Sequence, residues 1–404
     1  MLTMCLALTA SRSCLAGQMK LAPSLACSQA TSSTPEKKQV ARGSYVGDET
    51  CRSCHGDKTE TYWRTAHHRT SQPADKESIA GQFAPDANIL KTSNPGLFFR
   101  MDAKADGFYQ TAVLGIALVT TSRSERFDVV VGSGRKGQTY LYWKGDGLLQ
   151  LPVSYWVELG QWVNSPGYRD GVADFNRPVV PRCLECHATY AKSIAGLPPP
   201  NHYKKASVAF GIACERCHGP GLDHVAAHRS GSADASSRPI VNPLKLPRDR
   251  QVEVCAQCHG GPGKRLLASL FSYVPGEPLD DYIERDHFEP SAKVDVHGNQ
   301  VALLQKSRCF QSSAGMNCST CHDVHEPQRE AAAFSERCLT CHKVESCGLY
   351  PKMGAQIANK CVDCHMPNQE SNLIVSDSNG RQVKPKVRTH WIRVYSEAQT
   401  QEER

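Results

Sequence analysis

Long apolar segments are missing from this chain of 404 residues, and apolar side chains make up only 40% of it. A helix that spans a bilayer needs about 18 or more consecutive apolar residues. No stretch beyond the first 30 residues comes near that length, so we expect no transmembrane span apart from a leader or lipid anchor. The chain is long enough for one large domain or two ordinary ones, but its apolar content is low for a core of that size.

Acidic residues are absent from the first 30 positions, which are modestly apolar and end in small side chains. This composition resembles an export signal, although no basic residue precedes Arg12. Ser24 to Cys27 resembles a lipoprotein cleavage box without its usual leucine, so lipidation at Cys27 stays open. We expect an export signal at 1–30, a polar linker at 31–43, and a periplasmic or otherwise exported protein.

Cysteine, in contrast, is abundant, and 14 of the 19 cysteines follow one repeated pattern. Two cysteines three positions apart are followed at once by a histidine. The pattern occurs seven times, and we number the copies motifs 1 to 7 in chain order: Cys51/Cys54/His55, Cys183/Cys186/His187, Cys214/Cys217/His218, Cys255/Cys258/His259, Cys318/Cys321/His322, Cys338/Cys341/His342 and Cys361/Cys364/His365.

This spacing is that of a c-type haem attachment site. Residues three apart lie about one helical turn from each other, so both sulfurs can reach one edge of a flat macrocycle. The thiols form thioethers with two vinyl groups, and the histidine is the proximal iron ligand. Zinc sites and redox-active cysteine pairs share the cysteine spacing, but neither explains a histidine after every second cysteine. We therefore predict seven covalently attached haem c groups.

The cofactors change what the charge and the composition imply. The formal net charge is +7, but each ferric haem with two ionised propionates and two neutral axial ligands adds about one negative charge. The holoprotein is then near neutral, and we expect no nucleic-acid partner. The haems also supply apolar surface that the side chains lack, which predicts a haem-centred core and a largely unfolded apoprotein.

Histidine and cysteine are both absent between Leu97 and Trp162. Residues there alternate with a period of two between turn glycines, which predicts a β-meander of three to five strands. No helix follows the glycine-rich segment 132–137, so a hairpin turn is favoured over a nucleotide-binding loop. Near the end of the chain, the pattern predicts a second hairpin around Asn379 and Gly380.

From these patterns we expect a mainly α or irregular multihaem cytochrome with a β-meander insertion and little regular secondary structure. The predicted units are a first haem module at 44–96, the β-meander at 97–165, a six-haem module at 166–394 and a polar tail at 395–404. Cys309 and Cys347 belong to no motif, and they form either a disulfide or two buried free thiols.

Nine histidines lie outside the motifs and are candidates for the second axial ligand: His67, His68, His202, His224, His228, His287, His297, His325 and His390. Seven irons with two histidine ligands each would need seven of them. Because His67 and His68 are adjacent, we expect only one of the two to bind. A distal histidine can serve a haem far away in sequence, so this count does not assign them.

Four segments resemble the cytochrome c-554-like multihaem family: YVGDETCRSCH with YWRTAHH, CERCHGPGLDHV, MNCSTCHDVHEP and KCVDCHMP. The resemblance covers about residues 44–394. It implies an exported electron-transfer protein with stacked haem pairs, related in haem arrangement to hydroxylamine oxidoreductase and pentahaem nitrite reductase. It implies distal ligands at His67 or His68, His224, His297, His325 and His390, and it favours His202, His228 and His287 less.

One departure from that family concerns the last two motifs. Similar proteins often carry a histidine cluster between them, whereas residues 343–360 contain no histidine here. Some haem must then take a histidine from elsewhere, take Met353, or keep an open position. A methionine raises the haem potential, and an open position leaves a reactive iron. Ordinary packing is the simpler interpretation of Met353.

The leading prediction is an exported heptahaem cytochrome that moves electrons between redox protein partners or from quinol-linked donors. The alternative is a multihaem oxidoreductase that acts on a small nitrogen or sulfur compound at one five-coordinate haem. Tyr350, Lys352 and His287 are the candidate proton donors for such a site. Every motif ends in histidine, so the lysine-ligated catalytic motif of pentahaem nitrite reductase is absent. The sequence favours a carrier over a catalyst and leaves the enzymatic question open.

Overall fold

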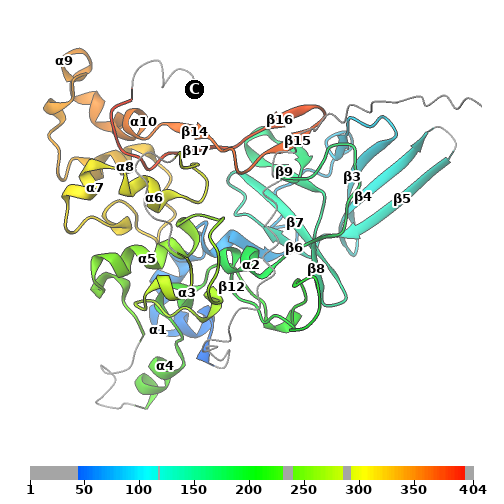
Figure 1. The fold of residues 1–404 in the computed structure, drawn as a ribbon, viewed down its shortest axis with the longest axis horizontal. Coiled ribbons are helices and arrows are strands. Elements are labelled where there is room, and N and C mark those ends of the chain that lie inside the picture. Colours follow the sequence, from blue (N-terminus) through cyan, green and yellow to red (C-terminus); the bar gives the residue numbers. More distant parts are fainter. Residues whose placement is uncertain (1–43, 117–118, 231–239, 285–292, 396–404) are drawn as a thin grey trace, which may run out of the picture.

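The structure is a computed structural model, which describes residues 44–116, 119–230, 240–284 and 293–395. The predicted export signal with Cys27, the linker, His287 and the tail beyond residue 395 lie outside the described residues. A β-rich half, built mainly from residues 71–178, stands beside a half of short helices that carries the motifs (Figure 1).

Two antiparallel sheets form the β-rich half. The first is a four-stranded meander in the order β2-β3-β4-β5, with bounds Ile89–Lys91, Leu97–Lys104, Gly107–Ile116 and Val119–Arg126. The second has the order β1-β6-β7-β8-β11, with bounds Ser71–Pro73, Val129–Val131, Gly137–Lys144, Gly147–Gln150 and Arg177–Pro178. Two further strands extend it, because β9 (Val153–Trp156) pairs with both β7 and β10 (Gln161–Asn164).

A conventional apolar core lies in the β-rich half. Strand β3 alternates as expected for a half-buried strand, with Leu97, Phe99 and Met101 buried. Phe127 and Tyr140 are almost fully buried in the same core, and their rings stack with centres 4.3 Å apart. No motif residue belongs to this cluster. The prediction that haem forms the core is therefore wrong for this half.

The helical half consists of short helices, many of which end on or contain a motif. Its α-helices are α1 (Asp48–Tyr62), α2 (Pro181–His187), α3 (Cys214–His218), α4 (Leu222–Arg229), α5 (Arg248–His259), α6 (Gln300–Gln305), α7 (Arg308–Ser312), α8 (Ala331–Cys338), α9 (Tyr350–Met353) and α10 (Cys361–His365). Helix α1 departs from helical geometry at the histidine of motif 1, His55, which has φ −118° and ψ 41°.

Three small two-stranded sheets complete the fold: β12 (Ala188–Tyr190) with β13 (Ala209–Phe210), β14 (Asn368–Glu370) with β17 (Lys386–Arg388), and β15 (Ser376–Ser378) with β16 (Arg381–Val383). The last is the hairpin predicted around Asn379 and Gly380, both of which have positive φ as a type I′ turn requires. Its turn returns to the β-rich half, where the Gly380 amide donates to Asp170 at 3.2 Å. Segment 132–137 likewise joins β6 to β7 in the predicted hairpin.

The prediction of a mainly α or irregular fold with little regular secondary structure is wrong. The described residues contain seventeen strands in several antiparallel sheets. Strands also extend well beyond a single meander of three to five, since the second sheet includes β1 and β11 from outside residues 97–165. Short strands such as β1 and β11 carry too few residues for a period of two to be recognised.

Truncating the core of the β-rich half should destabilise the protein without removing haem. Phe127 is 1% exposed, so we expect Phe127→Ala to lower the free energy of unfolding by about 3–5 kcal/mol through lost burial and a cavity. Denaturant titration followed by circular dichroism measures this loss. Leu159, which is 49% exposed, is the control, and Leu159→Ala should change stability by less than about 0.5 kcal/mol. Equal losses in both variants would contradict the assignment of this core.

Candidate haem-binding sites

All seven motifs face one shared cavity of about 5310 Å³, which both the helical half and strands of the β-rich half line, and each of their cysteines and histidines lines it. A site for a single small ligand usually measures about 300–1,000 Å³. The cavity is therefore several times larger than one such site. Its walls are contributed by segments along the whole described chain, from Val46 to Tyr395.

The charge on the cavity wall matches the charge of haem. Eighteen lysine and arginine residues line the cavity, whereas the acidic lining residues are only Asp323 and Glu326. Each haem carries two propionates, which are anionic at neutral pH. A wall so rich in cations suits several dianionic groups, and the excess positive charge of the sequence is placed where those groups bind.

Four proximal histidines are already oriented by a hydrogen bond at Nδ1. The four partners are Thr70 Oγ1 for His187 at 3.0 Å, the Val241 carbonyl for His218 at 2.8 Å, Gln300 Oε1 for His259 at 3.0 Å, and the Arg393 carbonyl for His365 at 2.8 Å. Holding Nδ1 in this way fixes the ring and leaves Nε2 for a metal. Burial lowers the pKa of His187 to about 4, which keeps the imidazole in the neutral form that binds iron.

Three candidate distal histidines lie opposite a proximal histidine at nearly the same distance. The ring centres are 6.0 Å apart for His67 and His259, 6.1 Å for His325 and His218, and 6.2 Å for His390 and His322. Two imidazoles that bind one metal from opposite sides, each through a nitrogen about 2 Å away, place their ring centres about 6 Å apart. The spacing thus fits one iron between the members of each pair.

Two further candidates lie near a proximal histidine. Burial lowers the pKa of His224, and the nearby imidazoles of His228 and His55 add to this effect. Burial likewise lowers the pKa of His297, whose imidazole in turn acts on His187. His224 therefore lies near motif 1, and His297 lies near both motif 2 and motif 4.

The remaining described histidines have other partners. His68 Nε2 lies 3.3 Å from an Asp48 carboxylate oxygen, and His202 Nδ1 lies 2.7 Å from an Asp146 oxygen. The ring of His228 stands edge-on to that of His224, 4.5 Å away. Of the adjacent pair, the structure thus turns His67 toward a proximal histidine and His68 toward a carboxylate. His287 lies outside the described residues.

The sequence left the roles of Met353, Cys309 and Cys347 undecided. Met353 is 39% exposed at the end of α9 and does not line the cavity. Cys309 and Cys347 are both free thiols of intermediate exposure. Cys309 lies within electrostatic range of Cys321 and Cys341, whereas Cys347 acts on Cys361.

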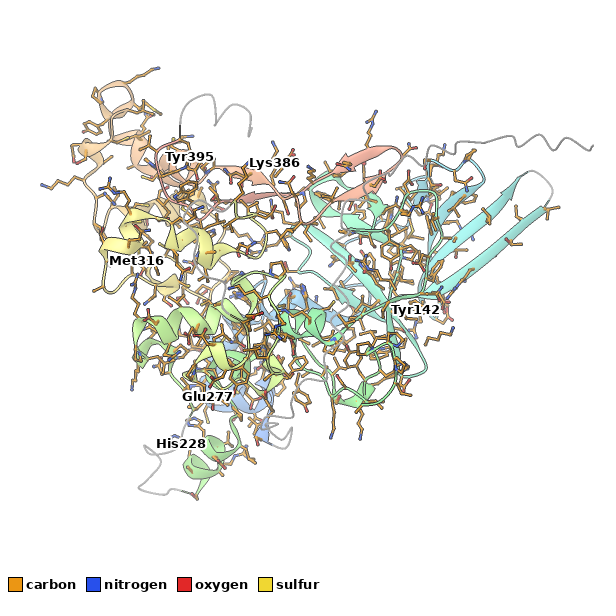
Figure 2. All side chains as sticks on the ribbon, in the orientation of Figure 1. Tyr142, His228, Glu277, Met316, Lys386 and Tyr395 are labelled. Carbon is orange, nitrogen blue, oxygen red and sulfur yellow. The ribbon has the colours of Figure 1, made fainter. Side chains whose placement is uncertain are left out.

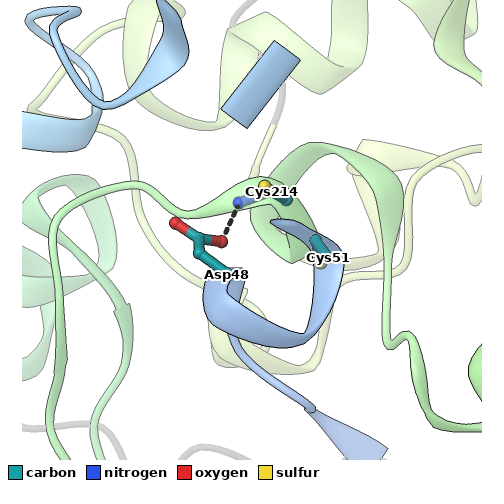
Figure 3. Close-up of side chains that lie close together, drawn as sticks. All are labelled: Asp48, Cys51 and Cys214. Atoms are coloured by element: carbon teal, nitrogen blue, oxygen red, sulfur yellow. Dashed lines mark hydrogen bonds between the residues drawn. The ribbon is translucent and has the colours of Figure 1, made fainter. Parts of the chain in front are cut away.

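Cysteines from different motifs lie next to each other. The thiols of Cys51 and Cys214 interact directly, and Asp48 accepts a hydrogen bond from the Cys214 amide at 2.9 Å (Figure 3). Equivalent thiol contacts join Cys186 to Cys258, Cys255 to Cys318, and Cys338 to Cys361. Donor atoms of Asp48, Cys51 and Cys214 lie within 4.8 Å of one another. Both cysteines belong to motifs, so this proximity indicates adjacent haem edges rather than a separate metal site.

The residues between the cysteines of motifs 2 and 3 hold the motifs together, a role that sequence reasoning missed. Glu215 accepts hydrogen bonds from the amides of Val46 and Gly47, each at 2.9 Å. Arg216 donates to the carbonyls of Glu185 and Leu270 at 2.8 and 2.6 Å. Both side chains are buried. The sequence pattern does not indicate this role, because the two positions between the cysteines of a motif are variable. Their burial links motif 3 to the chain before motif 1 and to motif 2.

The arrangement can be compared with known proteins. The family model described as cytochrome c554 and c-prime matches residues 170–219, which hold motifs 2 and 3. The chain also resembles the crystal structure of the outer cell wall cytochrome OcwA, with a TM-score of 0.52 and 19% sequence identity over 89% of this chain and 82% of that chain. No curated protein sequence matches the chain. The family match is narrower than the resemblance inferred from the motifs, whereas the similarity in fold covers 89% of the chain.

The chain thus resembles c-type cytochromes in the sequence of motifs 2 and 3 and in its fold. The seven motifs lie in the half built of short helices, beside the β-rich half. Figure 2 shows this division: His228, Glu277 and Met316 lie in the helical half, whereas Tyr142 lies among the strands.

Replacing each of the adjacent histidines separately tests their placement. His67→Ala should turn one low-spin haem of the cytochrome into a high-spin haem, because it removes the imidazole opposite His259. His68→Ala should leave every low-spin signal in place, because His68 faces Asp48. Electron paramagnetic resonance (EPR) of the oxidised holoprotein measures both. A new high-spin signal from His68→Ala, with none from His67→Ala, would reverse the assignment.

Proposed function

We propose that this cytochrome is an exported heptahaem electron carrier, in which seven covalently attached haems pass electrons between redox partners. Seven complete attachment motifs line one cavity, and the wall of that cavity carries the positive charge that haem propionates need. The observation that carries the proposal is the contact between cysteines of different motifs, because each cysteine marks one edge of its own haem.

These contacts support a continuous order of haems, numbered here as their motifs are. Haem 1 adjoins haem 3 through Cys51 and Cys214, and haem 3 reaches haem 4 because Cys217 acts on Cys255. Haem 4 adjoins haem 2 through Cys258 and Cys186, and haem 5 through Cys255 and Cys318. Haem 5 leads to haems 6 and 7 through Cys321, Cys338 and Cys361. Haem 4 is then the junction of the path.

The histidine geometry supports two imidazole ligands on three of the seven irons, and the pairs are His218 with His325, His259 with His67 and His322 with His390. His224 lies near His55, and His297 lies near both His187 and His259, so these two are candidate ligands of further irons. An iron held between two neutral histidines has no free position for a substrate, and its potential is tuned by hydrogen bonds and burial. Such sites are better suited to electron transfer than to catalysis.

We infer the location and the partners of the protein from the chemistry of haem attachment and from the similar solved structure. Among the described residues, no helix has the length and apolarity to span a membrane. The similar protein is named as an outer cell wall cytochrome, and c-type haem attachment with an N-terminal export signal fits the periplasm or another exported location. We propose redox proteins or quinol-linked donors as partners, with a first haem module at 44–96, a β insertion at 97–165 and a six-haem module at 166–394.

Reoxidation kinetics test the path. Intact mass should first show seven haems on the mature chain. Fully reduced holoprotein is mixed with a limiting amount of an oxidant as large as a protein. All haems should then be oxidised in one phase, because electron transfer between haems is faster than collision with the oxidant. His67→Met should raise the potential of haem 4 and split the trace into two phases, since electrons are retained at the junction.

His202→Met is the matched control, because His202 is paired with Asp146. It should leave a single phase. If the unmodified protein already oxidises haem by haem, with each rate set by its own exposure, the haems do not form a path. A mass corresponding to fewer than seven haems would contradict the cofactor count itself.

A further inference from the structure

Strand β5 forms one edge of the four-stranded sheet, which has the order β2-β3-β4-β5. It pairs with β4 over eight consecutive residues without a bulge, from Val119 to Arg126. All of these residues except Glu125 are exposed, and no strand pairs with the other side of β5 among the residues that the structure describes. The strand lies on the side of the β-rich half that faces away from the helical half (Figure 1). Strand β5 therefore presents a long, open sheet edge to solvent.

One hydrogen bond fixes the direction of the backbone groups along this edge. The Phe127 amide donates to the Phe108 carbonyl at 2.8 Å, and these two residues stand opposite each other when the register of β5 and β4 is continued by one residue. Hydrogen-bonded pairs in an antiparallel ladder recur at every second residue. Odd-numbered residues of β5 therefore bond to β4, whereas the even-numbered residues direct their amides and carbonyls to the open edge. These even-numbered residues are Thr120, Ser122, Ser124 and Arg126.

Strand β5 has few of the features that protect a sheet edge from pairing. Natural edges are protected by short strands, by bulges, by proline and by charged residues, especially lysine. Strand β5 has eight residues, contains neither proline nor lysine, and keeps a regular register. At the opposite edge of the sheet, β2 has only three residues and ends in Lys91. Of the two edges of this sheet, the one at β5 is therefore suited to receive a further strand.

The charges on β5 are complementary to those of a second copy of the same strand. Arg123 and Glu125 share one face of the sheet and form an ion pair at 3.0 Å. In an antiparallel pair of β5 strands whose two-fold axis passes through Ser124, Arg123 lies opposite the partner's Glu125 on both sides of the axis. These are non-hydrogen-bonded positions, where side chains approach most closely. An axis one residue away in either direction would place Arg123 opposite Arg123, or Glu125 opposite Glu125. Charge therefore favours the register centred on Ser124.

We propose that β5 pairs antiparallel with β5 of a second copy of this chain, so that two four-stranded sheets join into one sheet of eight strands in a two-fold symmetric dimer. Backbone hydrogen bonds form between the two Ser124 residues and between Ser122 and the partner's Arg126. The helical half lies away from β5, so the dimer leaves the half that carries the motifs free on both protomers (Figure 1). Because the pairing involves no motif residue, it is independent of the proposed electron transfer.

Light scattering coupled to size-exclusion chromatography tests the dimer on the holoprotein. The unmodified protein should have the mass of two chains and dissociate on dilution. Ser124→Pro should be monomeric, because it removes an amide at the open edge and leaves the bonds from β5 to β4 in place. Ser124→Ala keeps that amide and is the matched control, which should stay dimeric. A monomer at every concentration of the unmodified protein, or a dimer that persists in Ser124→Pro, would overturn the proposal.

Charge reversal tests the identity of the partner and the register. Glu125→Arg should weaken self-association at least about tenfold, because it places two arginines opposite each other. Arg123→Glu should do the same by placing two glutamates opposite each other. An equimolar mixture of the two variants should again have the mass of two chains, because every facing pair is then of opposite charge. A mixture that stays monomeric would contradict the register centred on Ser124.

A charge reversal on an interior strand provides the control for these variants. Asp102 forms an ion pair with Arg100 at 2.8 Å on β3, which lies between β2 and β4. Asp102→Arg should therefore leave the dimer intact, although it changes the net charge by the same amount as Glu125→Arg. Circular dichroism should give the same spectrum for each variant as for the unmodified protein. Equal weakening of the dimer by Asp102→Arg and Glu125→Arg would overturn the assignment of β5 as the pairing strand.

Discussion

The constraint that organises this protein is that each motif presents two cysteines and a histidine to one shared cavity, as haem attachment requires. Seven such sites share one cavity, so segments far apart in sequence must meet around it. Short helices suffice, because a motif needs little more than one turn to present its three side chains. Long-range order then depends on polar links between motifs. Glu215 ties motif 3 to the chain before motif 1, and Arg216 ties it to motif 2.

The placement of charged residues follows from the same constraint. The cavity wall has eighteen lysines and arginines but only two acidic residues, so its charge is strongly positive. A net charge of +7 is therefore a property of the protein without its cofactors rather than of the surface offered to partners. Where the cations of this wall have partners within the chain, as Arg388 has, they also hold the fold.

Sequence reasoning predicted the attachment chemistry and two hairpins, but it did not predict the proportion of β-structure. Motif chemistry is local, since three residues within five positions define each site. The Asn379–Gly380 turn is local for the same reason, because its two positive φ angles suit those residue types. Sheet formation depends on pairing across distance, and β1 and β11 are too short to show a periodicity. The choice between His67 and His68 was likewise undetermined, because it depends on Asp48 and His259, which arrive from different helices.

The segment from His67 to Ser71 shows why the β-rich half is more than an insertion. His67 faces His259 of motif 4, and Thr70 bonds to Nδ1 of His187 in motif 2. Ser71 begins β1, pairs with Val131 of β6, and donates from its hydroxyl to the His187 carbonyl. One short stretch thus connects the edge of the large sheet to the ligands of two haems that we place next to each other. Because the sheet is fixed by its own apolar core, it holds both imidazoles at set positions and orientations. The sheet edge thus adds to the polar links of Glu215 and Arg216 in fixing the positions of the motifs.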